Sequence, residues 1–99
     1  MQYTWDPAKN AANIRKHDIG FDDAVRVFES DVLGWPDERF DYGEARWIAI
    51  GLAGGEETVV VYTEKGDERR IISARRATRK ERELYWRWRG LGAVPTQDG

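Results

Sequence analysis

The 99-residue sequence predicts a single α+β domain with a mainly antiparallel sheet of about five strands. Two observations predict this class: helical patterns come early and strand patterns late, and glycine-containing turns join the late strands. The expected order is β-α-α-β-β-β-β-α, with two N-terminal helices and a C-terminal helix. We expect this domain to span residues 1–89, and residues 90–99, rich in Gly and polar residues, to form a flexible tail.

Residues 2–17 predict a short strand followed by a helix. The strand, Gln2–Trp5, places Tyr3 and Trp5 on one side. Asp6 suits the N-cap and Pro7 the first helical position, so the helix begins here and continues to a glycine-containing break. Two faces of this helix are expected: an inward face of Ala8, Ala11 and Ile14, and a stripe of Lys9, Asn13, Lys16 and His17.

The remaining elements follow from spacing and turn residues. A second, amphipathic helix is expected from Phe21 to about Ser30. Val59 to Tyr62 form an apolar run with no polar face, which predicts a central strand. A capping box of Thr78 and Glu81 begins the last helix, expected to pack inward through Leu84, Tyr85 and Trp88. The helices should cover one sheet face and leave the other partly open; the four late strands are Val32–Trp35, Arg46–Leu52, Thr58–Glu64 and Glu68–Ala74.

Composition and charge exclude several classes of protein. There is no Cys and one His, His17, so no disulfide, metal site or cofactor is expected. No apolar run reaches the ~20 residues of a membrane span, and no signal peptide is evident, so a cytoplasmic protein is expected. The net charge is −2. Residues 64–89 carry ten Lys/Arg against five Asp/Glu, so the basic charge is concentrated late in the chain.

The stretch Arg69–Arg82, RRIISARRATRKER, predicts a buried strand that ends in an arginine pair. The planar guanidinium fork suits phosphate, because it donates two parallel hydrogen bonds. Alternation along a strand places Arg70 and Arg76 on one face, so both are expected to bind phosphate. Arg75 is a third ligand or a bridge to a partner protein. The alternative is that these arginines form ordinary ion pairs with Glu64, Glu68 or Glu81.

Two separated blocks of the sequence resemble the BrnT-type toxins, over about residues 3–85. The first block is similar to the signature WDxxKxxxNxxKH…F, and the second to a block whose core reads RIISAR. The matching residues are Trp5-Asp6-Pro7-Ala8-Lys9, Asn13, Lys16-His17 and Phe21 in the first, and Val60–Glu64, Arg70–Ala77 and Glu81-Arg82 in the second.

The resemblance implies a toxin of a bacterial type II toxin–antitoxin pair, with a compact fold similar to RelE-type ribonucleases. It implies growth arrest by RNA cleavage, and neutralisation by a BrnA-type antitoxin that carries a ribbon-helix-helix region. The complex would repress its own operon, so operator DNA would be bound only through the antitoxin. The alternatives are a non-catalytic module that acts as a partner-dependent co-repressor, and a toxin with another target, such as gyrase.

Metal-independent RNA cleavage requires a base for the 2′-hydroxyl, a cation for the phosphorane and an acid for the leaving oxygen. Glu64, at the end of the central strand, is a candidate base, or else it orients the arginines. His17 is a candidate acid or base, or else it interacts with the negative end of its helix. Three further residues are candidates to contact RNA: Lys9 for phosphate, Trp5 for stacking on a base, and Arg79 at the start of the last helix. Lys9 is otherwise a solvated lysine, and Trp5 a core aromatic.

Overall fold

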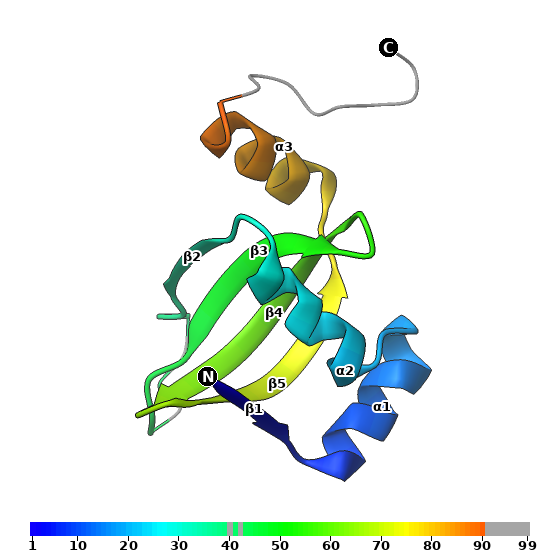
Figure 1. Cartoon of the computed structure of the whole chain (residues 1–99), viewed down its shortest axis with the longest axis vertical. Helices are drawn as coiled ribbons and strands as arrows, with labels where there is room; N and C mark the ends of the chain where they lie inside the picture. The colour runs from blue at the N-terminus through cyan, green and yellow to red at the C-terminus, as the bar shows by residue number, and fades with distance from the viewer. Residues whose placement is uncertain (40, 42, 91–99) are drawn as a thin grey trace.

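The computed structural model describes residues 1–39, 41 and 43–90, and it has the predicted element order (Figure 1). The expected second helix is divided into a short α-helix and a 3-10 helix. Apart from Gly90, the expected tail lies outside the described residues. The elements are β1 (Gln2–Trp5), α1 (Pro7–His17), α2 (Phe21–Ala24), η1 (Val25–Glu29), β2 (Leu33–Pro36), β3 (Trp47–Ala53), β4 (Glu56–Lys65), β5 (Glu68–Arg76) and α3 (Arg79–Trp88).

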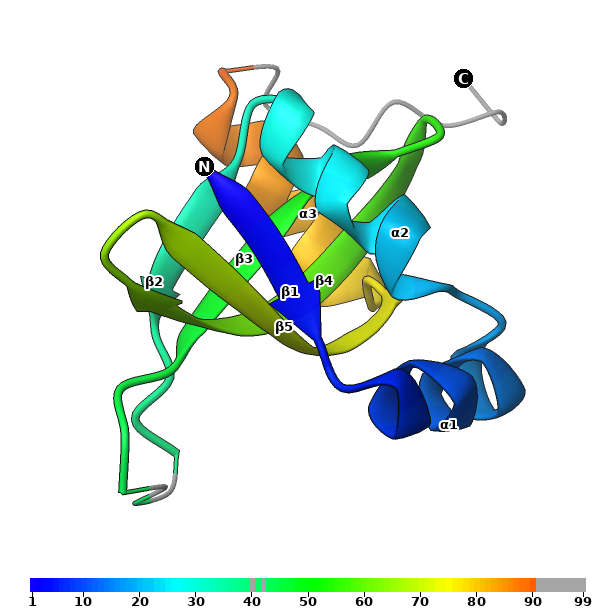
Figure 2. The ribbon, with the colours of Figure 1, turned by 60° about the horizontal axis from the view of Figure 1, so that its bottom comes forward.

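The five strands form one mixed sheet in the order β1-β5-β4-β3-β2. The strands from β2 to β5 pair antiparallel, whereas β1 pairs parallel with β5, which it flanks in Figure 2. The α+β class and the mainly antiparallel sheet are therefore confirmed. The apolar strand β4 lies in the middle of the sheet, as its sequence predicts.

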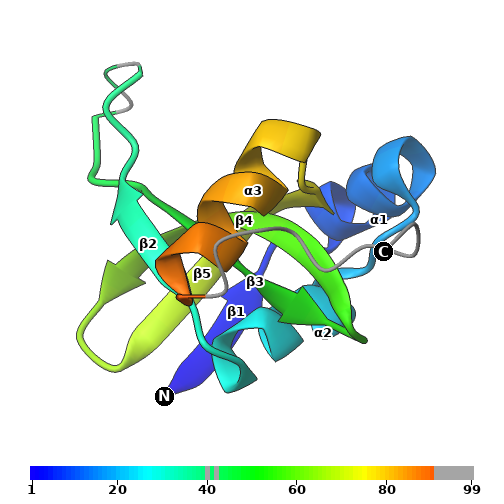
Figure 3. The same cartoon turned by 90° about the horizontal axis from the view of Figure 1, so that it is seen from above.

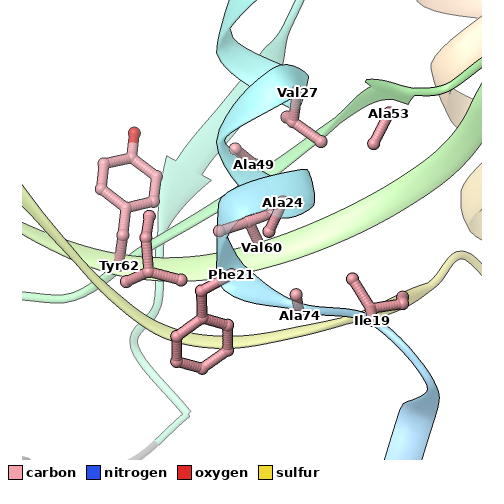
Figure 4. Packing of buried hydrophobic residues seen from close by; sticks show 10 residues of the cluster. Ile19, Phe21, Ala24, Val27, Ala49, Ala53, Val60, Tyr62 and Ala74 are labelled. Carbon is pink, nitrogen blue, oxygen red and sulfur yellow. The ribbon is translucent and has the colours of Figure 1, made fainter. Parts of the chain in front are cut away.

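The side of the sheet that α2 and η1 cover, here called the first face, carries the larger apolar cluster (Figure 4). Phe21, Ala24 and Val27 are completely buried there against Val60 of β4. Gly51 of β3 permits the close approach of η1, since a Cβ at this position would lie 2.8 Å from the Val27 carbonyl oxygen. The larger part of the domain's core therefore lies on this face.

The opposite side, here called the second face, is covered in part by α3 (Figure 3). The expectation that helices cover only one face is therefore wrong. Tyr85 is completely buried and packs with Trp86 against the second face. Leu84 and Trp88, expected to pack inward, are 46% and 47% exposed. The helix is rotated so that Trp86 faces the sheet, where its indole N–H donates to Glu57 Oε2 at 2.7 Å.

A β-bulge in β5 decides which arginine reaches which face. Val61 of β4 pairs with Ser73 and Tyr62 pairs with Ile71, so Ile72 is an extra residue without a partner on β4. Strict alternation fails at this point. Arg70 and Arg75 therefore lie on the second face, whereas Arg69 and Arg76 lie on the first, and the expectation that Arg70 and Arg76 share a face is wrong.

Helix α1 is attached to the sheet through an amide rather than through its apolar residues. Asn13 is 7% exposed, and its side chain donates to the carbonyls of Ile19 and Ala74, both at 2.9 Å. The Ala74 N–H donates in turn to Asn13 Oδ1 at 3.2 Å. The face expected to point inward is exposed instead, as Ala8, Ala11 and Ile14 show. The helix ends at Asp18, which adopts the left-handed conformation (φ 59°), whereas Gly20 of the expected break is extended (φ −82°).

Candidate functional site

The open part of the second face carries a row of polar side chains beside α3. The strand register places Thr4 of β1 and Thr63 of β4 on either side of Arg70. The next position along β5 on this face is Ser73, and the one after it is Arg75. Arg70 is exposed, and it forms no ion pair within the described part of the chain.

Arg75 is held in place by Glu81, in the first turn of α3. Arg75 Nη1 and Nη2 donate to the two oxygens of Glu81 at 2.8 and 2.9 Å. This pair raises the pKa of Arg75, and it lowers the pKa of Glu81 from its ordinary 4.5 to about 2. The Arg75 side chain remains 38% exposed, so part of its fork is open to a ligand.

A second guanidinium that acts on Arg75 belongs to Arg39, in the connection between β2 and β3. Arg39 donates through Nε and Nη2 to the two oxygens of Asp37, both at 2.8 Å. The Asp37 side chain is completely buried, whereas that of Arg39 is 56% exposed. The positive charge of Arg39 acts on Arg75 and opposes the increase in its pKa. Two like charges, each paired with its own carboxylate, therefore interact electrostatically.

Glu64, the expected base, lies on the first face. It accepts a hydrogen bond from Arg69 Nε at 2.7 Å, and Arg69 also donates to the Tyr3 hydroxyl at 3.3 Å. The Arg69 guanidinium stacks 4.5 Å from the centre of the Phe28 ring. Burial acts against the charge of Arg69, but these hydrogen bonds outweigh it and raise the pKa of Arg69. Glu64 therefore orients an arginine, one of the two roles expected for it, but it does not face Arg70 or Arg75.

Arg76 also lies on the first face, at the opposite end of β5. Its Nε is 2.8 Å from Glu56 Oε2, and its Nη1 donates to Thr58 Oγ1 at 3.3 Å. It lines a cavity of about 170 Å³ between the α1–α2 connection and the β3–β4 turn. The other lining residues have mixed charge: Asp18, Ile19, Asp23, Arg26, Ala53, Gly54 and Glu56.

The other expected site residues lie apart from both arginine groups. Lys9 is exposed on α1, and His17 is half-buried in the last turn of this helix. The Trp5 ring packs edge-on against Phe21 with centroids 6.2 Å apart, as part of the core. Arg79 has an 89% exposed side chain and pairs with Glu83 at 3.2 Å. The structure therefore divides the eight expected residues between two faces and two helices.

Sequence reasoning did not single out Arg39 or Glu68 as site residues. Glu68 lies two residues before Arg70 and on the same face, so strand alternation alone could have identified it. Arg39 is brought to this face by a loop, and no local pattern in the sequence predicts that position. Thr4 Oγ1, beside Arg70, is buried without a hydrogen-bond partner among the described residues. Within the same residues, no group of three or more His, Cys, Asp or Glu side chains is arranged to hold a metal ion.

The fold and this face define a small α+β domain with arginines on an open sheet surface. The sequence model of the family described as "Ribonuclease toxin, BrnT, of type II toxin-antitoxin system" matches residues 5–81, and the chain belongs to this family. Its partner is therefore a protein antitoxin, as in other type II systems. No individually curated protein matches the sequence significantly. In the described part of the chain, no helix has the length and apolar character to cross a membrane.

Proposed function

We propose that this chain is an endoribonuclease whose RNA site is the open part of the second face, and that it arrests growth until a BrnA-type antitoxin binds it. The observation that carries the proposal is the group of three arginines on this face. Arg70 has no carboxylate partner within the described part of the chain, and the positive charge of Arg39 acts on Arg75 and opposes the increase in the pKa of Arg75. An RNA phosphate would relieve that repulsion and satisfy the exposed guanidinium donors.

In the proposed reaction, the 2′-oxygen of a ribose attacks the adjacent phosphorus. The P–O5′ bond breaks, which leaves a 2′,3′-cyclic phosphate on one fragment and a 5′-hydroxyl on the other. The guanidinium N–H groups of Arg70 and Arg75 stabilise the charge that builds on the phosphorane oxygens. The reaction involves no change of oxidation state, so it requires no redox cofactor.

Two protons move in this reaction, and arginine supplies neither of them, because its guanidinium remains protonated at neutral pH. We assign removal of the 2′-hydroxyl proton to Glu68, whose carboxylate shares the second face with Arg70. His17, the other expected acid or base, lies on α1 apart from these arginines, so we assign the proton that the leaving 5′-oxygen takes up to solvent water. Lys9 and Arg79, both exposed, are left with the secondary role of contacting neighbouring nucleotides, whereas Trp5 belongs to the core.

Controlled expression with and without the neighbouring gene tests this proposal. We expect growth arrest and degraded transcripts when the toxin is expressed alone, and intact RNA when both genes are expressed. Purified protein should cleave RNA in the presence of a metal chelator. Growth arrest with intact RNA would favour another target, such as gyrase. Tight antitoxin binding without growth arrest or cleavage would favour a co-repressor.

A further inference from the structure

The outward side of α3 carries apolar side chains that the domain leaves uncovered. We refer to Lys80, Leu84, Arg87 and Trp88 as the α3 stripe, since steps of three and four residues place them on one side of the helix. Leu84 and Trp88 are 46% and 47% exposed. They are two of only four exposed large hydrophobic residues within the described part of the chain, and they are adjacent, one helical turn apart.

The two sides of α3 differ in whether their positively charged side chains form ion pairs. On the sheet side, Arg82 is 3.4 Å from Glu57 and Arg89 is 2.9 Å from Asp31, so these cations are neutralised. On the outward side, Lys80 and Arg87 form no ion pair with any described residue. The two acidic side chains of α3 that border the stripe already have partners, since Glu83 pairs with Arg79 and Glu81 with Arg75. The stripe is therefore apolar in the middle and positively charged along its length.

We propose that the α3 stripe binds an acidic, amphipathic segment of the antitoxin, an inference that rests on the proposed function. A segment with apolar residues at helical spacing would cover Leu84 and Trp88, and its carboxylates would pair with Lys80 and Arg87. RNA fits this surface less well, because Leu84 offers no donor to phosphate. The stripe points away from the sheet, so antitoxin binding here is separable from the RNA site.

Two pairs of matched variants test this assignment. Leu84→Ser removes apolar surface from the stripe, and Ile14→Ser removes a similarly exposed residue (44%) from α1. Lys80→Glu reverses a charge on the stripe, and Arg15→Glu reverses one on α1. The probe is the purified protein encoded by the neighbouring gene, and its Kd is measured by calorimetry. RNA cleavage by the same variants is measured separately.

We expect Leu84→Ser and Lys80→Glu each to weaken antitoxin binding by about tenfold or more, with rates of RNA cleavage unchanged. The two α1 variants should bind the antitoxin with the same Kd as the wild-type protein. Equal antitoxin affinity for all four variants would overturn the inference and leave the proposed ribonuclease activity intact. Loss of RNA binding in the α3 variants alone would assign the stripe to the RNA site. Self-association abolished by Leu84→Ser would assign it to a second copy of this chain. Absence of RNA cleavage by the unvaried protein would count against the proposed function and not against this surface.

Discussion

The two faces of the sheet receive arginines from the same strand but use them differently. On the first face, Arg69 is enclosed by aromatic rings and a carboxylate, and Arg76 pairs with Glu56. On the second face, Arg70 is exposed without an ion pair among the described residues, and Arg75 keeps a partly exposed side chain beside its pair with Glu81. Arginines that are clustered in the sequence therefore do not form a single binding site in the fold. The neighbours on each face decide whether an arginine stabilises the fold or is available to a ligand.

The largest expected effect on RNA cleavage comes from removing arginines of the second face while those of the first face are kept. Arg70→Ala and Arg75→Ala should each lower the rate of RNA cleavage by about 100-fold, because each removes a cation from the phosphorane. Arg76→Ala is the matched control on the first face and should stay within a few-fold of the unvaried protein. Cleavage rates on one defined RNA, with circular dichroism to verify folding, provide the measurement. If Arg76→Ala were the most impaired of the three, the RNA site would lie on the first face.

The next largest effect concerns the amide that attaches α1 to β5. Asn13→Ala should lower the free energy of unfolding by about 3 kcal/mol, since it leaves the buried N–H and C=O groups of Ala74 without their partner. Ile14→Ala, on the exposed side of the same helix, should change it by less than about 0.5 kcal/mol. Urea denaturation measures both variants. Similar values for the two would show that α1 is not held by this amide.

A smaller effect, dependent on pH, is expected from the pair that holds Arg75. The pKa of Glu81 is lowered in the folded protein, so the stability it contributes is present above pH 4.5 and is lost as the pH falls towards 2. After allowance for solvent screening, Glu81→Gln should cost about 1–2 kcal/mol at neutral pH. The difference from the unvaried protein should disappear in acid. A difference that stays constant down to pH 2 would place the effect in the helix cap, where Glu81 also accepts the Thr78 N–H at 2.8 Å.

The smallest effect concerns how α3 is fixed over the second face. The Tyr85 hydroxyl donates to the Asp31 carbonyl at 2.6 Å. Tyr85→Phe should lower the free energy of unfolding by about 1 kcal/mol and leave RNA cleavage unchanged, because the ring remains buried. Thermal denaturation and the cleavage assay together provide the measurement. A large loss of cleavage would show that the position of α3 controls access to the second face.

Much of the fold was predictable because it depends on local signals. The apolar run of β4, the capping box at Thr78 and Glu81, and the turn-forming glycines of the late strands each identify an element from its own residues. The predictions that failed depend on contacts between residues that are far apart in the sequence. The inward face of α1 was assigned by hydrophobicity, whereas the buried residue is Asn13, whose partners lie 6 and 61 residues away in the sequence.

The candidate site was less predictable for the same reason. Alternation along β5 identified the arginines, but the bulge at Ile72 reverses the alternation, and a bulge depends on the neighbouring strand. The contribution of Arg39 depends on where a loop is placed. The position of Glu68 on the face of Arg70 could be predicted from the sequence, because Glu68 precedes the bulge. The family match over residues 5–81 indicates the activity, and the proposed assignment to one face depends on the fold.

The attachment of Asn13 to Ala74 also bears on whether separate molecules aggregate. Strand β1 pairs with β5 only as far as Ile71, so the later residues of β5 would present a bare strand edge. An unpaired edge is a template for strands of other chains. The Asn13 amide occupies both backbone groups of Ala74 and so stands in for a missing strand. The Asn13 side chain of α1 thereby protects the edge of β5 from pairing with other molecules, at the residues of β5 that β1 does not reach.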